Sequence, residues 1–183
     1  MFVRSLKALV PKTLSLQSTE SRFVWQAVLV MAGGVMALTL ACITPFAAMA
    51  VLASRTLPWR NAILVLLGAV IANQAAGFGL LHYPETLSTF LWGPVFFIAT
   101  LAAFWASRIA RTSFALVAAF AANQMVLAAY TFVTERSLGT FSPPIVAQVA
   151  FANLLGFALL GLTYLGIVVM ERATEARTAR STR

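Results

Sequence analysis

Long uncharged, apolar stretches cover most of the chain. Windows of 18 or more residues without Lys, Arg, Asp or Glu occupy positions 23 to 54, 61 to 84, 86 to 107, 112 to 134 and 137 to 170. A membrane-spanning helix needs roughly 20 predominantly apolar residues, so each window is long enough to supply one. The pattern predicts an all-α integral membrane protein, a bundle of five or six transmembrane helices.

The first window, 23 to 54, has two interpretations: one long helix, or a tight hairpin of two short helices. Gly33, Gly34 and Pro45 favour the hairpin, because broken helices occur in membranes where they line a protein cavity. With a hairpin, the expected spans are 24 to 41, 43 to 54, 61 to 82, 88 to 107, 112 to 133 and 145 to 170.

The charges favour the hairpin as well. The chain carries 13 Lys and Arg against five Glu, a formal net charge of +8. With six helices, twelve of the 13 cations fall on one side of the membrane and only Arg136 falls on the other. Because cytoplasmic loops are rich in Lys and Arg, we expect both termini to be cytoplasmic and the protein to cross the inner membrane. The positive charge is then an orientation signal and does not indicate a nucleic-acid partner.

One transmembrane domain, residues 23 to 170, accounts for most of the chain. Residues 1 to 22 form a basic N-terminal segment, which is either an interfacial helix or a frayed tail. Residues 171 to 183 form a basic cytoplasmic tail.

Charged and metal-binding chemistry is nearly absent from the expected spans. Of the five residue types Asp, Glu, Lys, Arg and His, the expected spans contain only His82. Ion-coupled carriers place such groups in the membrane, so we do not expect the chain to energise transport alone. One Cys and one His cannot build a four-ligand zinc site, and phosphate-loop and hydrolase motifs are missing. The sequence therefore predicts no enzyme and no intrinsic cofactor; an enzyme built on Glu85 and Glu135 has no further support.

Five amide side chains fall inside the expected spans at a similar depth. Asn73 and Gln74 lie about nine residues before the outer end of the third helix, or roughly 13 Å deep. Asn123 and Gln124 lie about ten residues before the outer end of the fifth helix. Asn153 lies eight residues after the outer start of the sixth helix. Interhelical hydrogen bonding explains any one of them. The shared depth favours a polar cavity floor for a ligand with amide, hydroxyl or heterocyclic groups.

The expected outer end of the bundle carries His82, Tyr83 and Trp92. The two aromatic rings suit either stacking on a ligand or an ordinary interfacial belt. His82 either caps its helix or ligates a metal that the substrate brings with it. Cys42, in the turn of the first hairpin, has the same two-way interpretation, as a metal ligand or an inert buried thiol.

Small residues in the first window point to a family. Ala37-Leu-Thr-Leu-Ala41 is an AxxxA motif, which lets another helix approach closely. With six short helices and polar and aromatic residues at the outer ends, the chain resembles a substrate-binding S component of the energy-coupling factor vitamin transporters. The resemblance implies that a vitamin or its precursor binds from outside, and that Ala37 and Ala41 contact a coupling subunit that works with ATPases. Solitary members for cobalamin are similar in size, and cobalamin would give His82 or Cys42 a metal to bind.

The sequence thus predicts a membrane uptake protein for a vitamin-like small molecule, with cobalamin or a related cofactor precursor as the best candidate. The alternative is a noncatalytic assembly or scaffold subunit, in which the amides only lock helices together. The residues expected to bind substrate are Asn73, Gln74, His82, Tyr83, Trp92, Asn123, Gln124 and Asn153.

Overall fold

The computed structural model describes residues 15–39, 44–135 and 141–181, and within these ranges the chain is helical without any strand. The helices are α1 (Thr19–Thr39), α2 (Phe46–Thr56), α3 (Trp59–Gly79), α4 (Leu87–Ile109), α5 (Ala115–Glu135) and α6 (Pro143–Ser181), with a 3₁₀ turn, η4 (Thr112–Phe114), before α5. All of the α-helices except α2 are long and apolar enough to cross a membrane. The expected all-α membrane fold is confirmed.

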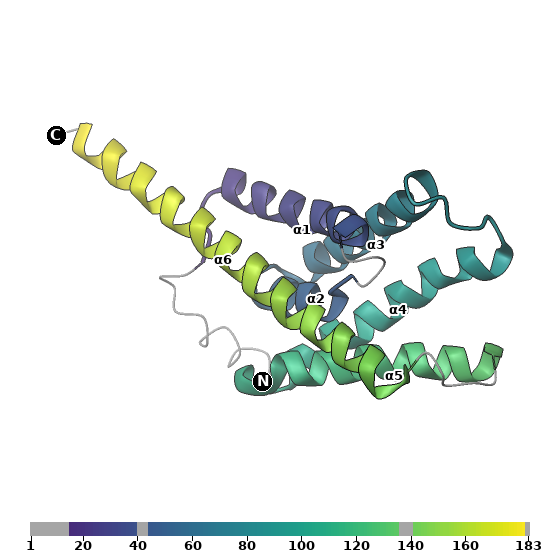
Figure 1. Cartoon of the computed structure of the whole chain (residues 1–183). Coiled ribbons are helices and arrows are strands. Elements are labelled where there is room, and N and C mark those ends of the chain that lie inside the picture. The colour runs from purple at the N-terminus through teal and green to yellow at the C-terminus, as the bar shows by residue number, and fades with distance from the viewer. Residues whose placement is uncertain (1–14, 40–43, 136–140, 182–183) are drawn as a thin grey trace.

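The first apolar window forms two helices, as the hairpin interpretation requires. Trp25, near the start of α1, donates its indole N–H to Thr56 Oγ1 at the end of α2, over 2.8 Å. The end of α2 therefore lies beside the beginning of α1, and α2 runs back along the bundle (Figure 1).

Helices α1 and α3 are parallel and closely packed. Val30 lies against Gly68, and Gly34 lies against the backbone of Ala72, so the contacts advance in the same direction along both helices. The small residues let the two backbones approach, as they do in many membrane helix pairs.

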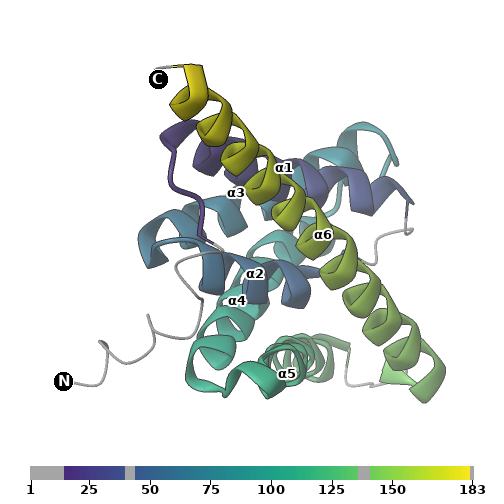
Figure 2. The ribbon, with the colours of Figure 1, turned by 90° about the vertical axis from the view of Figure 1, so that its left-hand side faces the viewer.

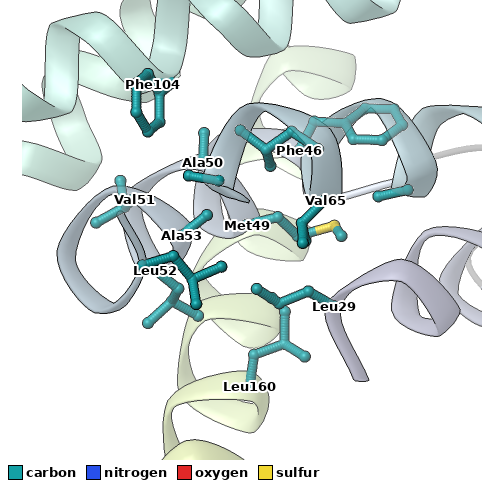
Figure 3. Close-up of a cluster of buried hydrophobic side chains, with 14 of the residues drawn as sticks. Leu29, Phe46, Met49, Ala50, Val51, Leu52, Ala53, Val65, Phe104 and Leu160 are labelled. Carbon is teal, nitrogen blue, oxygen red and sulfur yellow. The ribbon is translucent and has the colours of Figure 1, made fainter. Parts of the chain in front are cut away.

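Helix α2 is short and central. Its 11 residues span roughly 16 Å at 1.5 Å per residue, about half of the 30 Å hydrocarbon core. Nine of them, Phe46 to Ser54, are buried. Side chains from the neighbouring helices surround α2, as Figure 3 shows for Leu29 of α1, Val65 of α3, Phe104 of α4 and Leu160 of α6. A helix too short to span the bilayer is thus enclosed by protein, where membranes tolerate it.

The far end of α2 is joined to the end of α4. One guanidinium nitrogen of Arg55 donates hydrogen bonds to the Ser107 carbonyl over 2.6 Å and to the Ala110 carbonyl over 3.1 Å. The Ser107 hydroxyl also donates to Ser54 Oγ over 2.8 Å. The last carbonyls of a helix lack intrahelical partners and carry partial negative charge, so the cation both caps α4 and fixes α2 against it.

The last two helices pack on different parts of the bundle. Helix α5 packs on α4 and α2, whereas α6 packs on α2 and α1. In Figure 2 α6 crosses in front of the bundle while α5 lies at its lower side.

Both ends of the described chain lie at one end of the bundle. The backbone N–H of Ser18 donates to Glu171 Oε1 over 2.5 Å, and that of Gln17 lies 3.1 Å from both carboxylate oxygens. Helix α6 thus holds the chain where it enters α1. Burial acts to raise the pKa of Glu171, but hydrogen bonds from Ser18, Gln17 and Ser21 outweigh it and lower this pKa below its ordinary value.

A matched pair of glycine substitutions tests the α1–α3 contact. A Cβ at Gly33 would lie 2.8 Å from the Cα of Ala69 and overlap its carbonyl, whereas a Cβ at Gly161 meets nothing within 4 Å. We expect Gly33→Ala to lower stability by about 1–3 kcal/mol through overpacking. Gly161→Ala should be neutral or slightly stabilising, because alanine favours the helix. Thermal unfolding in detergent measures both, and equal effects would contradict the close packing of α1 on α3.

The Glu171 contact predicts a pH dependence of stability. A carboxyl whose pKa is lowered by folding stabilises the folded state above its unfolded value, near 4.5, and this stabilisation disappears as the pH falls through the folded value. Glu171→Gln should therefore lower the unfolding temperature at pH 6 and have a smaller effect near pH 3.5. Glu175→Gln, at an exposed position one turn farther along α6, is the control. An equal loss at both pH values would show that the charge of Glu171 is not what holds the contact.

Candidate functional site

A cavity of about 340 Å³ lies between α2, α3, α4, α5 and α6. Tyr83, in the segment between α3 and α4, and Phe141, just before α6, are among its lining residues. Since α1 and α3 are parallel, these connections lie at the end of the bundle opposite to the Glu171 contact. The cavity therefore extends inward from that opposite end.

Four of the five amides predicted from sequence line this cavity: Asn73 and Gln74 of α3, and Asn123 and Gln124 of α5. Their depths are less equal than expected. Asn73 lies roughly 9 Å from the end of α3 and Asn123 roughly 18 Å from the end of α5, at 1.5 Å per residue. The four amides still line the same cavity, because α5 extends farther beyond its amides than α3 does.

The two pairs of amides differ in their hydrogen bonds. Asn73 Nδ2 donates to Thr44 Oγ1 over 2.6 Å, and Gln74 Nε2 donates to Asn73 Oδ1 over 3.3 Å. By contrast, Asn123 Nδ2 and Gln124 Nε2 are buried and have no hydrogen-bond partner among the described residues. The α3 pair thus locks the start of α2 in place, whereas the α5 pair belongs to the cavity lining and has two buried amide nitrogens without a partner among the described residues.

Asn153, the fifth amide, does not line the cavity; it caps α2. Its Oδ1 accepts a hydrogen bond from the backbone N–H of Ala48 over 3.1 Å, and its Nδ2 donates to the Val149 carbonyl over 2.9 Å. The backbone of α6 comes close here, since a Cβ at Gly156 would lie 2.6 Å from Pro45 Cγ. The substrate-binding role expected for Asn153 is therefore replaced by a role in holding the buried end of a helix.

Aromatic rings form part of the cavity wall. The Trp92 ring lies 5.5 Å from that of Phe96 and meets that of Tyr130 edge to face at 4.9 Å, measured between ring centroids. Tyr83 is held against α3, because its ring lies where a Cβ at Gly77 would come within 2.5 Å of it. Tyr83 and Trp92 both line the cavity, so two of the three expected outer-end residues lie at it.

The third outer-end residue, His82, is exposed and does not line the cavity. Its φ of 53° lies in the left-handed region, which His adopts more readily than most residues, and it turns the chain just after α3. Cys42, the other candidate metal ligand, lies outside the described residues. Among the residues that are described, no group of three His, Cys, Asp or Glu is placed to hold a metal ion.

The expected partner-contact residues are only partly described. Ala37 is 1% exposed, so its side chain lies within the bundle and not on a surface that a separate subunit could reach. In the structure, the small residues of α1 serve packing inside the bundle. Ala41 lies outside the described residues.

The start of α2 contributes to the cavity, which the sequence did not predict. Thr44 and Phe46, at the start of this helix, line the cavity beside the amides. The expected span 43 to 54 included both residues, but neither was named as a binding residue. Pro45 was the one available signal, since proline is favoured where a helix begins. No Asp, Glu, Lys, Arg or His is among the described residues that line the cavity.

Comparisons of the chain with protein-family models, curated proteins and solved structures found no match.

The different surroundings of two asparagines give a prediction. Asn153→Leu removes the acceptor for the Ala48 N–H and should lower stability by about 1–3 kcal/mol, the cost of a buried unsatisfied donor. Asn123→Leu removes a buried donor that has no partner among the described residues, and should leave stability unchanged or raise it. Thermal unfolding of both variants without added ligand measures the difference. A larger loss in Asn123→Leu would contradict the roles given to the two amides.

Proposed function

We propose that this protein binds a vitamin-like small molecule in the cavity, from the outer face of the inner membrane, as a step in its uptake. The observation that carries the proposal is the gathering of four amides, Tyr83 and Trp92 around one cavity. Ligand sites are usually concave and mostly apolar with a few convergent polar groups, and have volumes of about 300–1,000 Å³. The cavity of about 340 Å³ matches that description.

The arginines support an outward-facing cavity. Arg22 is near the start of α1, Arg55 contacts the end of α4, and Arg172 follows Glu171 on α6, so all three are at the end of the bundle away from the cavity. The positive-inside rule assigns such an end to the cytoplasm. On this basis the cavity opens to the outside and both termini are cytoplasmic.

The cavity chemistry also bears on how uptake would be driven. No Asp, Glu, Lys, Arg or His is among the described residues that line the cavity, so none of them is a carboxylate or imidazole that would couple proton movement to ligand release. We therefore propose that energy comes from partner proteins, as in the energy-coupling factor transporters that the chain resembles. The volume favours a compact ligand over cobalamin, whose ring and nucleotide loop make it a much larger molecule.

The alternative, an assembly or scaffold subunit, is supported by a separate set of contacts. The Asn73 bond to Thr44 and the Asn153 bond to Ala48 lock helices together, as a scaffold would require. They do not account for Asn123 and Gln124, whose amide donors are buried without a partner among the described residues.

The test is to purify the protein from cells grown in rich medium and to identify small molecules that co-purify by mass spectrometry. Val149 lines the cavity, so Val149→Phe should fill it and reduce the retained ligand, and its uptake into cells, at least tenfold. Val169, on the same helix, is 65% exposed, and Val169→Phe is the matched control that should leave both unchanged.

Two results would count against uptake. Retention of the same molecule by Val149→Phe would place the ligand elsewhere. A protein that carries no small molecule, and whose loss changes no uptake, would favour the scaffold alternative.

A further inference from the structure

Two unpartnered donors define the chemistry of the cavity on the α5 side. Asn123 is only 5% exposed, and its Nδ2 has no hydrogen-bond partner among the described residues. Gln124 Nε2, on the next residue, is also buried without a partner there. Buried polar groups are almost always hydrogen-bonded, so a buried donor that lines a cavity indicates an acceptor on whatever occupies it.

The start of α2 adds a second feature that favours an acceptor. Thr44 and Phe46 line the same cavity, so the N-terminus of the buried helix faces it. A helix N-terminus carries a partial positive charge of roughly half an elementary charge. Two N–H groups at this end already have acceptors, because that of Phe46 donates to the Thr44 carbonyl and that of Ala48 donates to Asn153 Oδ1.

These groups suit a neutral acceptor better than an anion. No Lys, Arg or His is among the described residues that line the cavity, so a buried carboxylate or phosphate would have no cation beside it. The partial charge of the capped helix end does not replace one. A cationic ligand is disfavoured too, since the unpartnered groups are donors and no Asp or Glu lines the described cavity.

We infer that the cavity takes an uncharged, planar ligand whose edge presents carbonyl oxygens or ring nitrogens to Asn123 and Gln124. The rings of Trp92 and Phe96, 5.5 Å apart between centroids, give the flat face of such a ligand an aromatic wall. This inference rests on the proposed function, because it names the class of molecule for the same cavity.

Matched pairs of small probes test the charge of the ligand directly. Nicotinamide and nicotinate, and uracil and orotate, are planar rings that differ within each pair by a carboxylate. The full chain in lipid nanodiscs is titrated with each probe at pH 7.4, and binding is followed by saturation-transfer NMR. We expect the uncharged member of each pair to bind at least tenfold more tightly than the anionic member.

Two variants and a control identify the groups responsible. Asn123→Leu and Gln124→Met are apolar and close in size to the native residues, and each should weaken binding of the uncharged probes about tenfold. Gln148→Leu replaces an exposed amide of α6 that does not line the cavity, and should leave binding unchanged. Thermal unfolding of each variant confirms that it is folded. If Asn123→Leu does not fold, Gln124→Met alone tests the role of the α5 amides.

The outcomes separate this inference from the proposed function. Equal or tighter binding of nicotinate and orotate, weakened by the same variants, would overturn the uncharged class while leaving the cavity as a ligand site. Failure of both uncharged probes to bind, or binding that neither variant weakens, would overturn the role of Asn123 and Gln124. The proposed function would then be judged by the co-purified molecule and the Val149→Phe variant alone.

Discussion

The fold depends on enclosing a helix that is too short to cross the membrane. In a hydrocarbon environment every backbone N–H and C=O must find a partner, so both ends of α2 need one within the protein. Asn153 supplies an acceptor at its start, and at its end the N–H of Leu57 donates to the Ala53 carbonyl, while Arg55 joins this end to the carbonyls of α4. The other helices are arranged around these contacts: α1 and α3 on one side, α4 and α5 on another, and α6 across them (Figure 2).

The same enclosure creates the cavity. Because α2 does not extend through the whole bundle, the cavity next to Thr44 is bounded by longer helices instead, among them α5 and α6. Asn73 satisfies Thr44 at this boundary, while Asn123 and Gln124 face the remaining space without partners among the described residues. One short helix therefore accounts for both the packed centre and the polar hollow next to it.

Hydropathy predicted the helices well because the length of an apolar run relates directly to the thickness of the bilayer. The last helix is longer than its expected span: α6 continues to Ser181, beyond the apolar run that ends at 170, because the tail is rich in alanine, glutamate and arginine, which favour helix in water as well. The amides of the cavity were found from their spacing. The different role of Asn153 was not, because whether an amide faces a cavity or a helix end is set by contacts such as that with Ala48, 105 residues away in sequence.

Helix α6 connects two distant parts of the molecule as a single rod. Val149 lines the cavity near its beginning, and Glu171 holds the entry to α1 near its end, roughly 33 Å away at 1.5 Å per residue. No proline interrupts the helix between them. Because one unbroken helix carries both residues, a tilt of α6 at the cavity would also move the end that holds the entry to α1.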